Sequence, residues 1–327
     1  MEISRDDVIA AYRFFLEREP ESKDAIDAWL RPTTSRAELR EGFLHSDEYQ
    51  SKNFVLHPSL SGMEPPIVSQ IDSDLNDAQN RTLFSAVKET WTHLGDVDPY
   101  WAVLSMDEFH GADDGETIER FYRSGAGDVQ FIERTLERNG VTLPAQATVV
   151  EYGSGLGRVT SHLAQRFATV IGVDISPTMV RAATARMAEK RLANVSFRLL
   201  EAFDDIDSLP ACDLFFSLIV LQHSPPPLIS KAVRSAIRAL KPEGVAIFQV
   251  PTYIPEYKFL ADDYISGKNI ASFEAPHHLF EMHAVRQCDL FGIIYGAGGM
   301  VLEIFEDKRM GVDYQGAMSN TFVVRKR

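Results

Sequence analysis

The first part of the chain has apolar residues at the spacing of amphipathic helices. Ser4 and Asp7 form a capping pair, and apolar residues then recur every three or four positions from Val8 onwards. Two further segments of this kind follow, the second of them over residues 35–44. Together they predict a small helical module over residues 1–56, which is too short to bury a large core of its own.

The next part of the chain is predicted to be a linker followed by a helical leader. Residues 57–66, HPSLSGMEPP, are rich in Pro, Ser and Gly, which is typical of a linker. From there to residue 139 the pattern is mainly helical, with interruptions at GDVDPYW and FHGADDGE. We therefore expect residues 57–139 to precede the main domain.

Near residue 147 the period of the pattern changes, and short β-rich runs begin to alternate with helical stretches. Because such alternation is typical of parallel strands joined by crossover helices, it predicts a doubly wound α/β domain over residues 140–327. Residues 251–277 interrupt the alternation and are expected to form an insertion on the acceptor side. The expected strands are 147–151, 169–174, 195–200, 212–217, 244–250, 301–305 and 320–325, with a helix near 278–295.

Composition narrows the class of protein. Apolar residues make up 45% of the chain and charged residues 24%, the balance of an ordinary globular domain. No apolar run approaches the roughly 18 residues that a membrane-spanning helix needs, and the N-terminus does not have the pattern of a signal peptide. The two cysteines, Cys212 and Cys288, predict no disulfide framework. The net charge of −14 disfavours a nucleic-acid partner, and we expect a cytoplasmic location.

The strongest chemical signal is a glycine-rich turn in VVEYGSGLGRVT, residues 149–160. A hydrophobic strand runs directly into Gly153, Gly155 and Gly157, and a helical pattern follows. Glycines at these positions permit positive φ and let a ligand lie against the backbone. The next predicted strand ends at Asp174, where a carboxylate can accept hydrogen bonds from both hydroxyls of an adenosine ribose.

The turn has two other interpretations. A nicotinamide-binding turn has a third glycine that lets helix and strand pack closely, but the corresponding position here is the bulky Arg158. The spacing therefore favours a ligand without a pyrophosphate, such as S-adenosylmethionine (SAM). The plainer alternative is a tight turn without any ligand, with Asp174 as a helix cap.

Four segments, in this order, resemble class I SAM-dependent methyltransferases. EYGSGLG (151–157) and VIGVDISPTM (170–179) resemble the first two motifs of that family. CDLFFSLIVLQH (212–223) and LKPEGVAIFQ (240–249) resemble its fourth strand and the turn into its fifth strand. The resemblance covers roughly residues 120–327. It implies SAM as cofactor and a Rossmann-like sheet of seven strands, mostly parallel, with the last strand antiparallel.

The resemblance also assigns residues to the cofactor. It places Glu151 at the methionyl amino group and Asp174 at the ribose hydroxyls, and it leaves open whether Glu201, Asp204 or Asp205 meets the adenine amino group. The cofactor-binding residues that it predicts are Glu151, Gly153, Gly155, Gly157, Asp174, Ile175, Met179, Ala202, Phe203, Ser217 and Leu218.

Methyl transfer is an in-line displacement that needs an aligned acceptor and, for a hydroxyl acceptor, the loss of a proton. His223, just beyond the fourth strand, has an ordinary pKa that suits a general base, or else it orders the proline-rich turn that follows it. His278 is a second candidate for the base. Tyr253, Tyr257 and His277 belong to the insertion, where they either contact the acceptor or pack the insertion itself. No histidine spacing predicts a metal site.

The leader contains a further resemblance. DPYWAVL (98–104) and FYRSG (121–125) are similar to a leader found before the sheet in some bacterial small-molecule and glycan methyltransferases. By that resemblance Tyr100, Trp101 and Tyr122, with the phenylalanine before Tyr122, cover the cofactor. The alternative is that they bury the leader against the sheet.

AYRFFLEREP (11–20) and GFLHSDEYQ (42–50) resemble a small helical module that is common in bacterial proteins and is often joined to surface-polysaccharide or secreted enzymes. This resemblance points to a glycan or glycolipid acceptor. We therefore expect O-methylation of a small molecule or a sugar unit. The alternatives are N-methylation, or binding of SAM or of a partner without catalysis. The sequence leaves the oligomeric state open.

Overall fold

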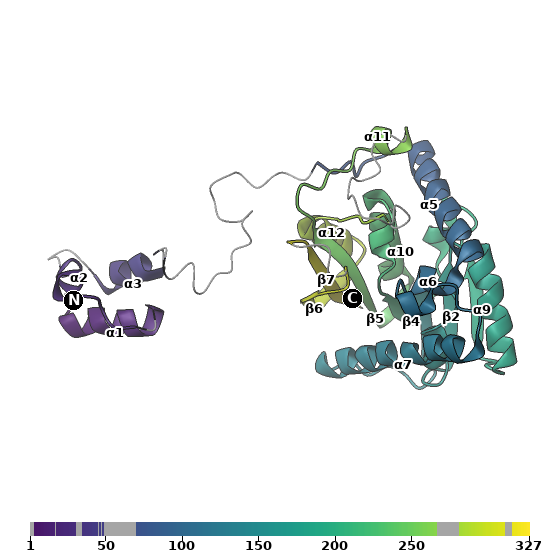
Figure 1. Cartoon of the computed structure of the whole chain (residues 1–327), viewed down its shortest axis with the longest axis horizontal. Coiled ribbons are helices and arrows are strands. Elements are labelled where there is room, and N and C mark those ends of the chain that lie inside the picture. Colours follow the sequence, from purple (N-terminus) through teal and green to yellow (C-terminus); the bar gives the residue numbers. More distant parts are fainter. Residues whose placement is uncertain are drawn as a thin grey trace. The chain divides into compact units, whose positions relative to one another are not determined.

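The computed structural model describes residues 3–16, 18–30, 35–44, 46, 48, 70–266, 281–310 and 316–327. The chain divides into two compact units, Met1–Val68 and Ser69–Arg327 (Figure 1). Each unit has its own hydrophobic core. The predicted linker at residues 57–66 lies outside the described residues.

The described part of the first unit contains the three helices that the apolar pattern predicts. The N–H of Ser4 donates to Asp7 Oδ2 at 2.8 Å, and the N–H of Ser35 donates to Glu38 Oε2 at 2.7 Å. Both capping pairs satisfy backbone groups that would otherwise lack an intrahelical partner. The helices are α1 (Arg5–Leu16), α2 (Lys23–Asp27) and α3 (Arg36–Leu44).

The helical leader belongs to the second unit. Its longest members begin with side-chain caps: Asn76 and Gln79 form a reciprocal capping box, and the Asp114 side chain accepts from the N–H groups of Glu116 and Thr117. The leader consists of α5 (Asp77–Val97), α6 (Pro99–Val103), the 3₁₀ turn η2 (Asp107–Phe109) and α7 (Gly115–Arg138).

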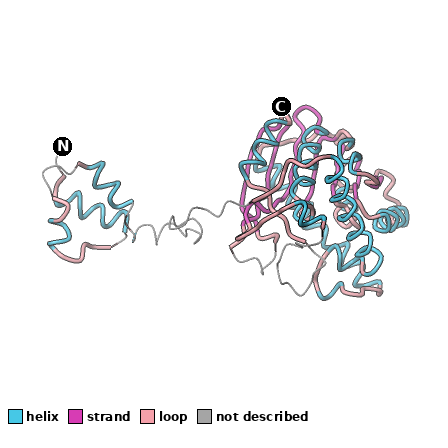
Figure 2. The backbone as a smooth tube through the Cα atoms, turned by 90° about the horizontal axis from the view of Figure 1, so that it is seen from above, coloured by secondary structure: helices cyan, strands magenta, loops and turns pink. Residues whose placement is uncertain are grey.

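A seven-stranded sheet in the order β3-β2-β1-β4-β5-β7-β6 forms the centre of the second unit (Figure 2). The pairs among β1 to β5 are parallel, and β7 runs antiparallel to both β5 and β6. The predicted Rossmann-like fold, with its antiparallel last strand, is confirmed. The strands are β1 (Thr148–Tyr152), β2 (Thr169–Asp174), β3 (Val195–Leu199), β4 (Cys212–Ser217), β5 (Leu240–Tyr253), β6 (Gly299–Asp307) and β7 (Met318–Lys326).

Helices cover both faces of this sheet. On β4 and β5, Phe215 and Ala246 pack into the core that includes α10, whereas Leu214 and Val245 pack into the core that includes α7. Burial on both faces explains why these strands are continuously apolar in sequence. The remaining elements are α8 (Thr160–Leu163), α9 (Pro177–Glu189), η3 (Phe203–Ser208), η4 (Leu221–His223), α10 (Pro226–Ala239), α11 (Ala261–Ile265) and α12 (Gln287–Gly296). No helix among the described residues is long and apolar enough to cross a membrane.

The segment after the insertion differs from its prediction. The helix expected near 278–295 begins only at Gln287, and residues 281–286 have no regular structure. Within them His283 is fully buried. Its backbone N–H donates to the Gln222 carbonyl at 2.8 Å, so a tertiary hydrogen bond takes the place of a helical one.

Candidate functional site

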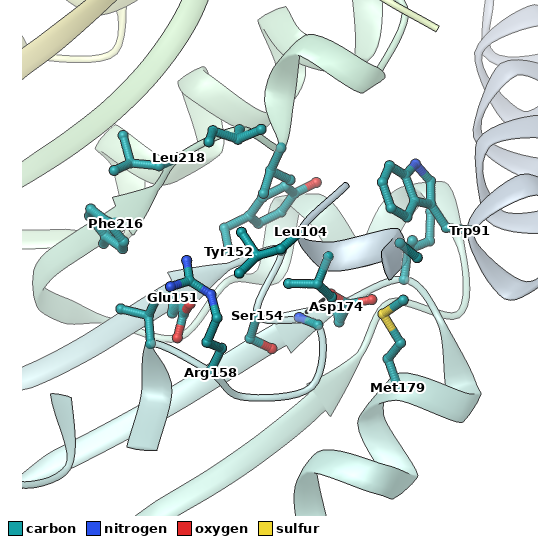
Figure 3. A pocket seen from close by; sticks show the side chains of 18 of the residues that line it. Trp91, Leu104, Glu151, Tyr152, Ser154, Arg158, Asp174, Met179, Phe216 and Leu218 are labelled. Carbon is teal, nitrogen blue, oxygen red and sulfur yellow. Dashed lines mark hydrogen bonds between the residues drawn. The ribbon is translucent and has the colours of Figure 1, made fainter. Parts of the chain in front are cut away.

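The chain reverses its direction of travel across the sheet at β1. It passes from β1 to β2 and β3 on one side, and then to β4 and β5 on the other. In open α/β sheets, ligands bind outside the carboxyl ends of the strands at such a switch point. A cavity of about 130 Å³ lies at this edge, lined by the ends of β1, β2 and β4 and by the leader (Figure 3).

The glycine turn forms one wall of the cavity. Gly153 and Gly155 have φ of +76° and +50°, a left-handed region that favours glycine. A Cβ on Gly153 would lie 2.3 Å from Val220 Cγ2, and a Cβ on Gly155 would lie 2.8 Å from Val103 Cγ2. The two valines therefore rest against the turn. A ligand that lies against the backbone of the turn shares this space with the two valine side chains.

Asp174 ends β2 at the cavity wall. Its Oδ2 accepts from the Gly155 N–H at 2.7 Å, and its Oδ1 accepts from the Ser176 N–H at 2.8 Å. A carboxylate has about four lone-pair directions, so Asp174 keeps capacity for a further donor. Burial raises the pKa of Asp174, and the backbone hydrogen bonds from Ser176 and Gly155 act in the opposite direction. The side chain is thus held rigidly with unused acceptor capacity.

Glu151, on β1, lies at the end of the cavity away from Met179 (Figure 3). Its side chain is buried, and the Thr160 hydroxyl donates to its Oε2. Burial raises the pKa of Glu151 to about 8, although the Thr160 hydroxyl and the Arg158 guanidinium lower it. Because a nearby positive charge favours the ionised form of a carboxyl, a cation bound here would bring Glu151 into its charged state.

Arg158 and Ser154 provide polar atoms without partners at the same wall. Arg158 forms an ion pair with Asp128 of α7 at 2.6 Å and donates to Ser124 Oγ at 3.1 Å. Its Nε, and the hydroxyl of Ser154, are buried without a hydrogen-bond partner among the described residues. Such groups cost about 1–3 kcal/mol each, which favours a ligand that pairs with them. Sequence reasoning had used Arg158 only to disfavour nicotinamide.

The rest of the wall is largely apolar, and the leader supplies part of it. Val87 and Trp91 of α5 and residues 102–104 line the cavity. The sequence did not identify them, although Leu83, Val87 and Trp91 recur every four residues and so mark one face of a helix. The other apolar members include Ile175, Met179, Leu200, Phe216 and Leu218.

The leader residues that the resemblance places over the cofactor do not line the cavity. Tyr100 and Phe121 pack edge to face at 5.1 Å in the core between leader and sheet. The ring of Trp101 packs against that of His110, with 5.5 Å between the ring centroids. Tyr122 donates its hydroxyl to the Leu156 carbonyl at 3.2 Å, behind the glycine turn rather than over the cavity. The leader does line the cavity, but with neighbouring residues.

Seven of the eleven predicted cofactor residues line the cavity, and four do not. Gly157 faces helix α9, where a Cβ would lie 3.2 Å from Met187 Cε. Ala202 is exposed, and Phe203 points into the core with the Lys231 ammonium over its ring. Ser217 donates its hydroxyl to the Tyr152 carbonyl at 3.0 Å. The seven that line the cavity are Glu151, Gly153, Gly155, Asp174, Ile175, Met179 and Leu218.

The three acids considered for the adenine amino group lie outside the cavity lining. Asp205 accepts hydrogen bonds from the N–H groups of Glu201 and Ala202, at 2.8 and 2.9 Å. Asp204 forms an ion pair with Arg81 at 2.6 Å. In this structure Asp204 and Asp205 therefore organise the loop after β3.

His223 lies next to the cavity without lining it. Its ring packs against that of Trp91, with 5.5 Å between the ring centroids, and the following residue, Ser224, is part of the lining. Its Nδ1 lies 2.9 Å from the Glu281 carbonyl oxygen. Burial lowers the pKa of His223 to about 4, so the imidazole is neutral at physiological pH.

The described residues that were predicted to contact the acceptor do not line the cavity. Tyr253 ends β5, and the Tyr257 hydroxyl is buried 2.7 Å from His283 Nδ1, so neither belongs to the cavity lining. His277 and His278 lie outside the described residues.

Comparison with known proteins begins with a family model. Residues 149–244 match the model described as a methyltransferase domain. Over 101 residues the chain is 32% identical to ubiquinone biosynthesis O-methyltransferase of Pseudomonas fluorescens (strain Pf0-1), covering 31% of this chain and 42% of that protein. Over 110 residues it is 38% identical to trans-aconitate 2-methyltransferase of Deinococcus radiodurans, covering 32% and 38%. The chain thus spans less than half the length of these two relatives.

One solved structure resembles most of the chain. It is magnesium protoporphyrin IX methyltransferase from Synechocystis PCC 6803 with bound SAH, with a TM-score of 0.50 and 19% identity. The match covers 75% of this chain and all of that one. At this identity the likeness establishes the fold.

Proposed function

We propose that this chain, which carries a methyltransferase domain in a class I fold, is a SAM-dependent methyltransferase that binds SAM in the cavity at the switch point. The observation that carries the proposal is the set of polar groups beside the glycine turn. Glu151 is an acid that a cation would ionise, and Ser154 Oγ and Arg158 Nε lack partners among the described residues. An acid and a guanidinium at one wall suit the ammonium and carboxylate of an amino-acid zwitterion.

The other walls support the same placement. The unused acceptor capacity of Asp174 suits a pair of ribose hydroxyls, and the apolar Ile175 and Met179 beside it suit an adenine ring. Nicotinamide dinucleotides carry a pyrophosphate and no ammonium group, so this distribution of charge fits them less well. When bound, SAM supplies an electrophilic methyl carbon. The chain's own residues orient the acceptor against it.

For the acceptor we propose a hydroxyl of a small molecule or a sugar unit. The two curated relatives are named for ubiquinone biosynthesis and for trans-aconitate, and apart from Asp128 the leader residues that line the cavity are apolar. His223 is the proposed base: its imidazole is neutral at physiological pH and lies beside the cavity, next to the lining residue Ser224. An amine acceptor would not need this base, and a protein that binds SAM without catalysis would lack any turnover.

Calorimetry of the full chain with SAM and with NAD tests the cofactor. We expect SAM to bind and NAD to give no heat of binding; binding of NAD alone would end the proposal. Transfer of a radiolabelled methyl group to a panel of phenols, hydroxy acids, amines and nucleotide sugars then identifies the acceptor class. If SAM binds but no acceptor is labelled, a binding function without catalysis replaces the enzymatic one.

A matched pair of variants tests the polar wall. Arg158 and Arg166 both form ion pairs with acids of α7, but only Arg158 lines the cavity. We expect Arg158→Met to weaken SAM binding at least tenfold, about 1.4 kcal/mol. Arg166→Met should leave the affinity unchanged. Equal affinities of the two variants would remove Arg158 from the site.

A further inference from the structure

A row of buried polar side chains runs behind the cavity, from β7 through β5 to the turn after β4. Its members are Ser319, Gln249 and Gln222, which are 2%, 0% and 2% exposed. A buried amide is costly unless each of its donors and acceptors is paired with a group of the opposite kind. The direction of every hydrogen bond in the row is therefore set by its neighbours.

The direction begins at the backbone of Ile219. The N–H of Ile219 points at Gln249 Oε1, 3.0 Å away, and an N–H can only donate. The Gln249 amide nitrogen must therefore face the other way, where it donates to Gln222 Oε1 at 2.9 Å and to Ser319 Oγ at 2.7 Å. Gln249 is thus fixed in one of its two possible orientations.

The same logic continues to the imidazole. Because Gln222 Oε1 faces Gln249, the Gln222 NH₂ faces His223 Nε2 at 3.2 Å, so that Nε2 must be the accepting atom. On the other side of the ring Nδ1 faces the Glu281 carbonyl at 2.9 Å, which can only accept. Both sides specify the neutral form with the proton on Nδ1.

We infer that Gln249 is a positioning residue that, through Gln222, keeps Nε2 of His223 unprotonated. Protonation of Nε2 would require Gln222 to turn its oxygen towards the ring. That turn would set the Gln222 and Gln249 NH₂ groups against each other, and Gln249 cannot turn in response because the Ile219 N–H faces its oxygen. In the resting protein the row thus favours the neutral imidazole with Nε2 as its accepting atom.

Gln249 acts on the cavity wall as well. Ile219 lines the cavity and has φ of +57°, a left-handed conformation that is unfavourable for a β-branched residue. The hydrogen bond from its N–H to Gln249 holds it there. One buried amide therefore sets both the shape of the wall and the hydrogen-bonding state of the neighbouring histidine.

Other titratable groups also face His223. Burial has the largest effect on the pKa of His223 and lowers it. The Glu281 carboxylate raises this pKa because it favours the charged imidazolium, and His283 lowers it. The Glu281 carboxylate accepts from the Tyr264 hydroxyl at 2.5 Å and lies 3.0 Å from His283 Nε2. Trp91 of α5 covers the ring without adding charge. Among the described residues, the hydrogen bonds of the Gln249 side chain go to Ile219, Gln222 and Ser319 and to none of these groups, so Gln249→Met removes none of their own contacts with the ring.

Nitrogen-15 NMR of the full chain tests the inference without a substrate. Signals of His223 are assigned by their loss in His223→Gln. We expect a protonated Nδ1 and an unprotonated Nε2 at neutral pH in the unaltered protein. In Gln249→Met, which cannot hold the Gln222 amide, the titration midpoint of His223 should rise by at least about one pH unit, a tenfold gain in proton affinity.

Thr252→Val is the matched control. Thr252 is buried on β5, the strand that also carries Gln249, and its hydroxyl donates to Asn320 of β7. Thr252→Val therefore removes a buried hydrogen bond but none of those that join Ser319, Gln249 and Gln222. We expect the His223 midpoint to stay in place. A proton on Nε2 in the unaltered protein, an unshifted midpoint in Gln249→Met, or an equal shift in Thr252→Val would each overturn the inference.

The use of Nε2 as a base rests on the proposed function, but its protonation state does not. Failure of SAM to bind would remove the proposed function and leave the NMR result intact. If an acceptor is found, the acidic limb of the pH–rate profile should move to higher pH in Gln249→Met, because His223 in this variant becomes protonated at a higher pH. An unmoved limb, together with a raised midpoint, would separate His223 from the proton transfer.

Discussion

At the scale of single residues, the distinctive feature of the site is a buried acid beside a half-buried arginine. Burial raises the pKa of Glu151 to about 8, whereas Arg158 forms an ion pair with Asp128. An ammonium group bound at Glu151 favours the ionised form of this acid. We therefore expect binding of SAM to be coupled to the release of a proton.

This coupling predicts a pH dependence of SAM binding. Below the pKa of about 8, Glu151 is mostly protonated, so the affinity should rise roughly tenfold per pH unit and level off above pH 8. Calorimetry in buffers with different ionisation heats would measure the released proton. Glu151→Gln should bind SAM with a flat profile, and a pH-dependent affinity in that variant would refute the assignment.

The same shift affects the ligand-free protein with a defined sign. The folded-state pKa of Glu151 is raised above the unfolded value of 4.5, so the folded state binds more protons between pH 4.5 and about 8. The contribution of Glu151 to the free energy of unfolding is therefore largest below pH 4.5 and decreases as pH rises through 8.

Asp174 provides the second prediction at this scale. In Asp174→Asn the side chain can still accept from the Ser176 N–H, but it loses the charge and an acceptor for the ribose hydroxyls. SAM affinity should fall by roughly 1.5–3 kcal/mol, the range for hydrogen bonds to a charged group. Asp204→Asn, at an exposed ion pair, is the control. Similar affinities in both variants would contradict the ribose role.

At the scale of elements, the glycine turn combines backbone strain with close contact, and the two can be separated. Gly155 and Gly111 both have positive φ, but a Cβ on Gly111 would meet nothing within 4 Å. Gly111→Ala should lower stability by roughly 1 kcal/mol through strain alone. Gly155→Ala carries the same strain and also projects a methyl group towards Val103 and the cavity.

We therefore expect Gly155→Ala, and not Gly111→Ala, to weaken SAM binding at least tenfold. Denaturant unfolding and calorimetry on both variants would distinguish the two effects. A loss of affinity in proportion to the loss of stability in both variants would show that the turn does not touch the ligand.

The elements also show what the sequence could and could not predict. The strands follow from apolar runs, because a sheet buried on both faces leaves a continuous hydrophobic signal. The segment 281–286 lacked any such signal: its hydrogen bonds go to Gln222 and Pro251, which are distant in sequence. Similarly, the spacing of Val87 and Trp91 marks a helix face, but only the tertiary packing of α5 shows that this face meets a cavity.

The residues of the candidate site also divide into those that the sequence could predict and those that it could not. Two of the three glycines and Asp174 could be predicted from local pattern because they end or follow strands at the switch point, whereas Glu151 was predicted from the family resemblance. Ala202, Phe203 and Ser217 could not, because their direction depends on packing that is absent from the pattern: Phe203 turns towards Lys231, and Ser217 towards the Tyr152 carbonyl.

At the scale of the whole molecule, all residues that line the cavity belong to the unit Ser69–Arg327. A ligand that binds only the folded form stabilises the unit that holds its site, by about 2.7 kcal/mol at a hundred times its Kd. We expect SAM to raise the thermal transition of this unit by roughly 5–10 °C. The transition of the unit Met1–Val68 should not move. A shift of both transitions in scanning calorimetry would indicate that SAM acts on the two units together.

Val103 and Val220, which rest against the glycine turn, have a kinetic consequence. If the turn is reached only after these side chains swing aside, entry of SAM proceeds through an opening step that belongs to the protein. The observed association rate would then stop increasing at high SAM concentration, and exit of the spent cofactor would wait for the same opening.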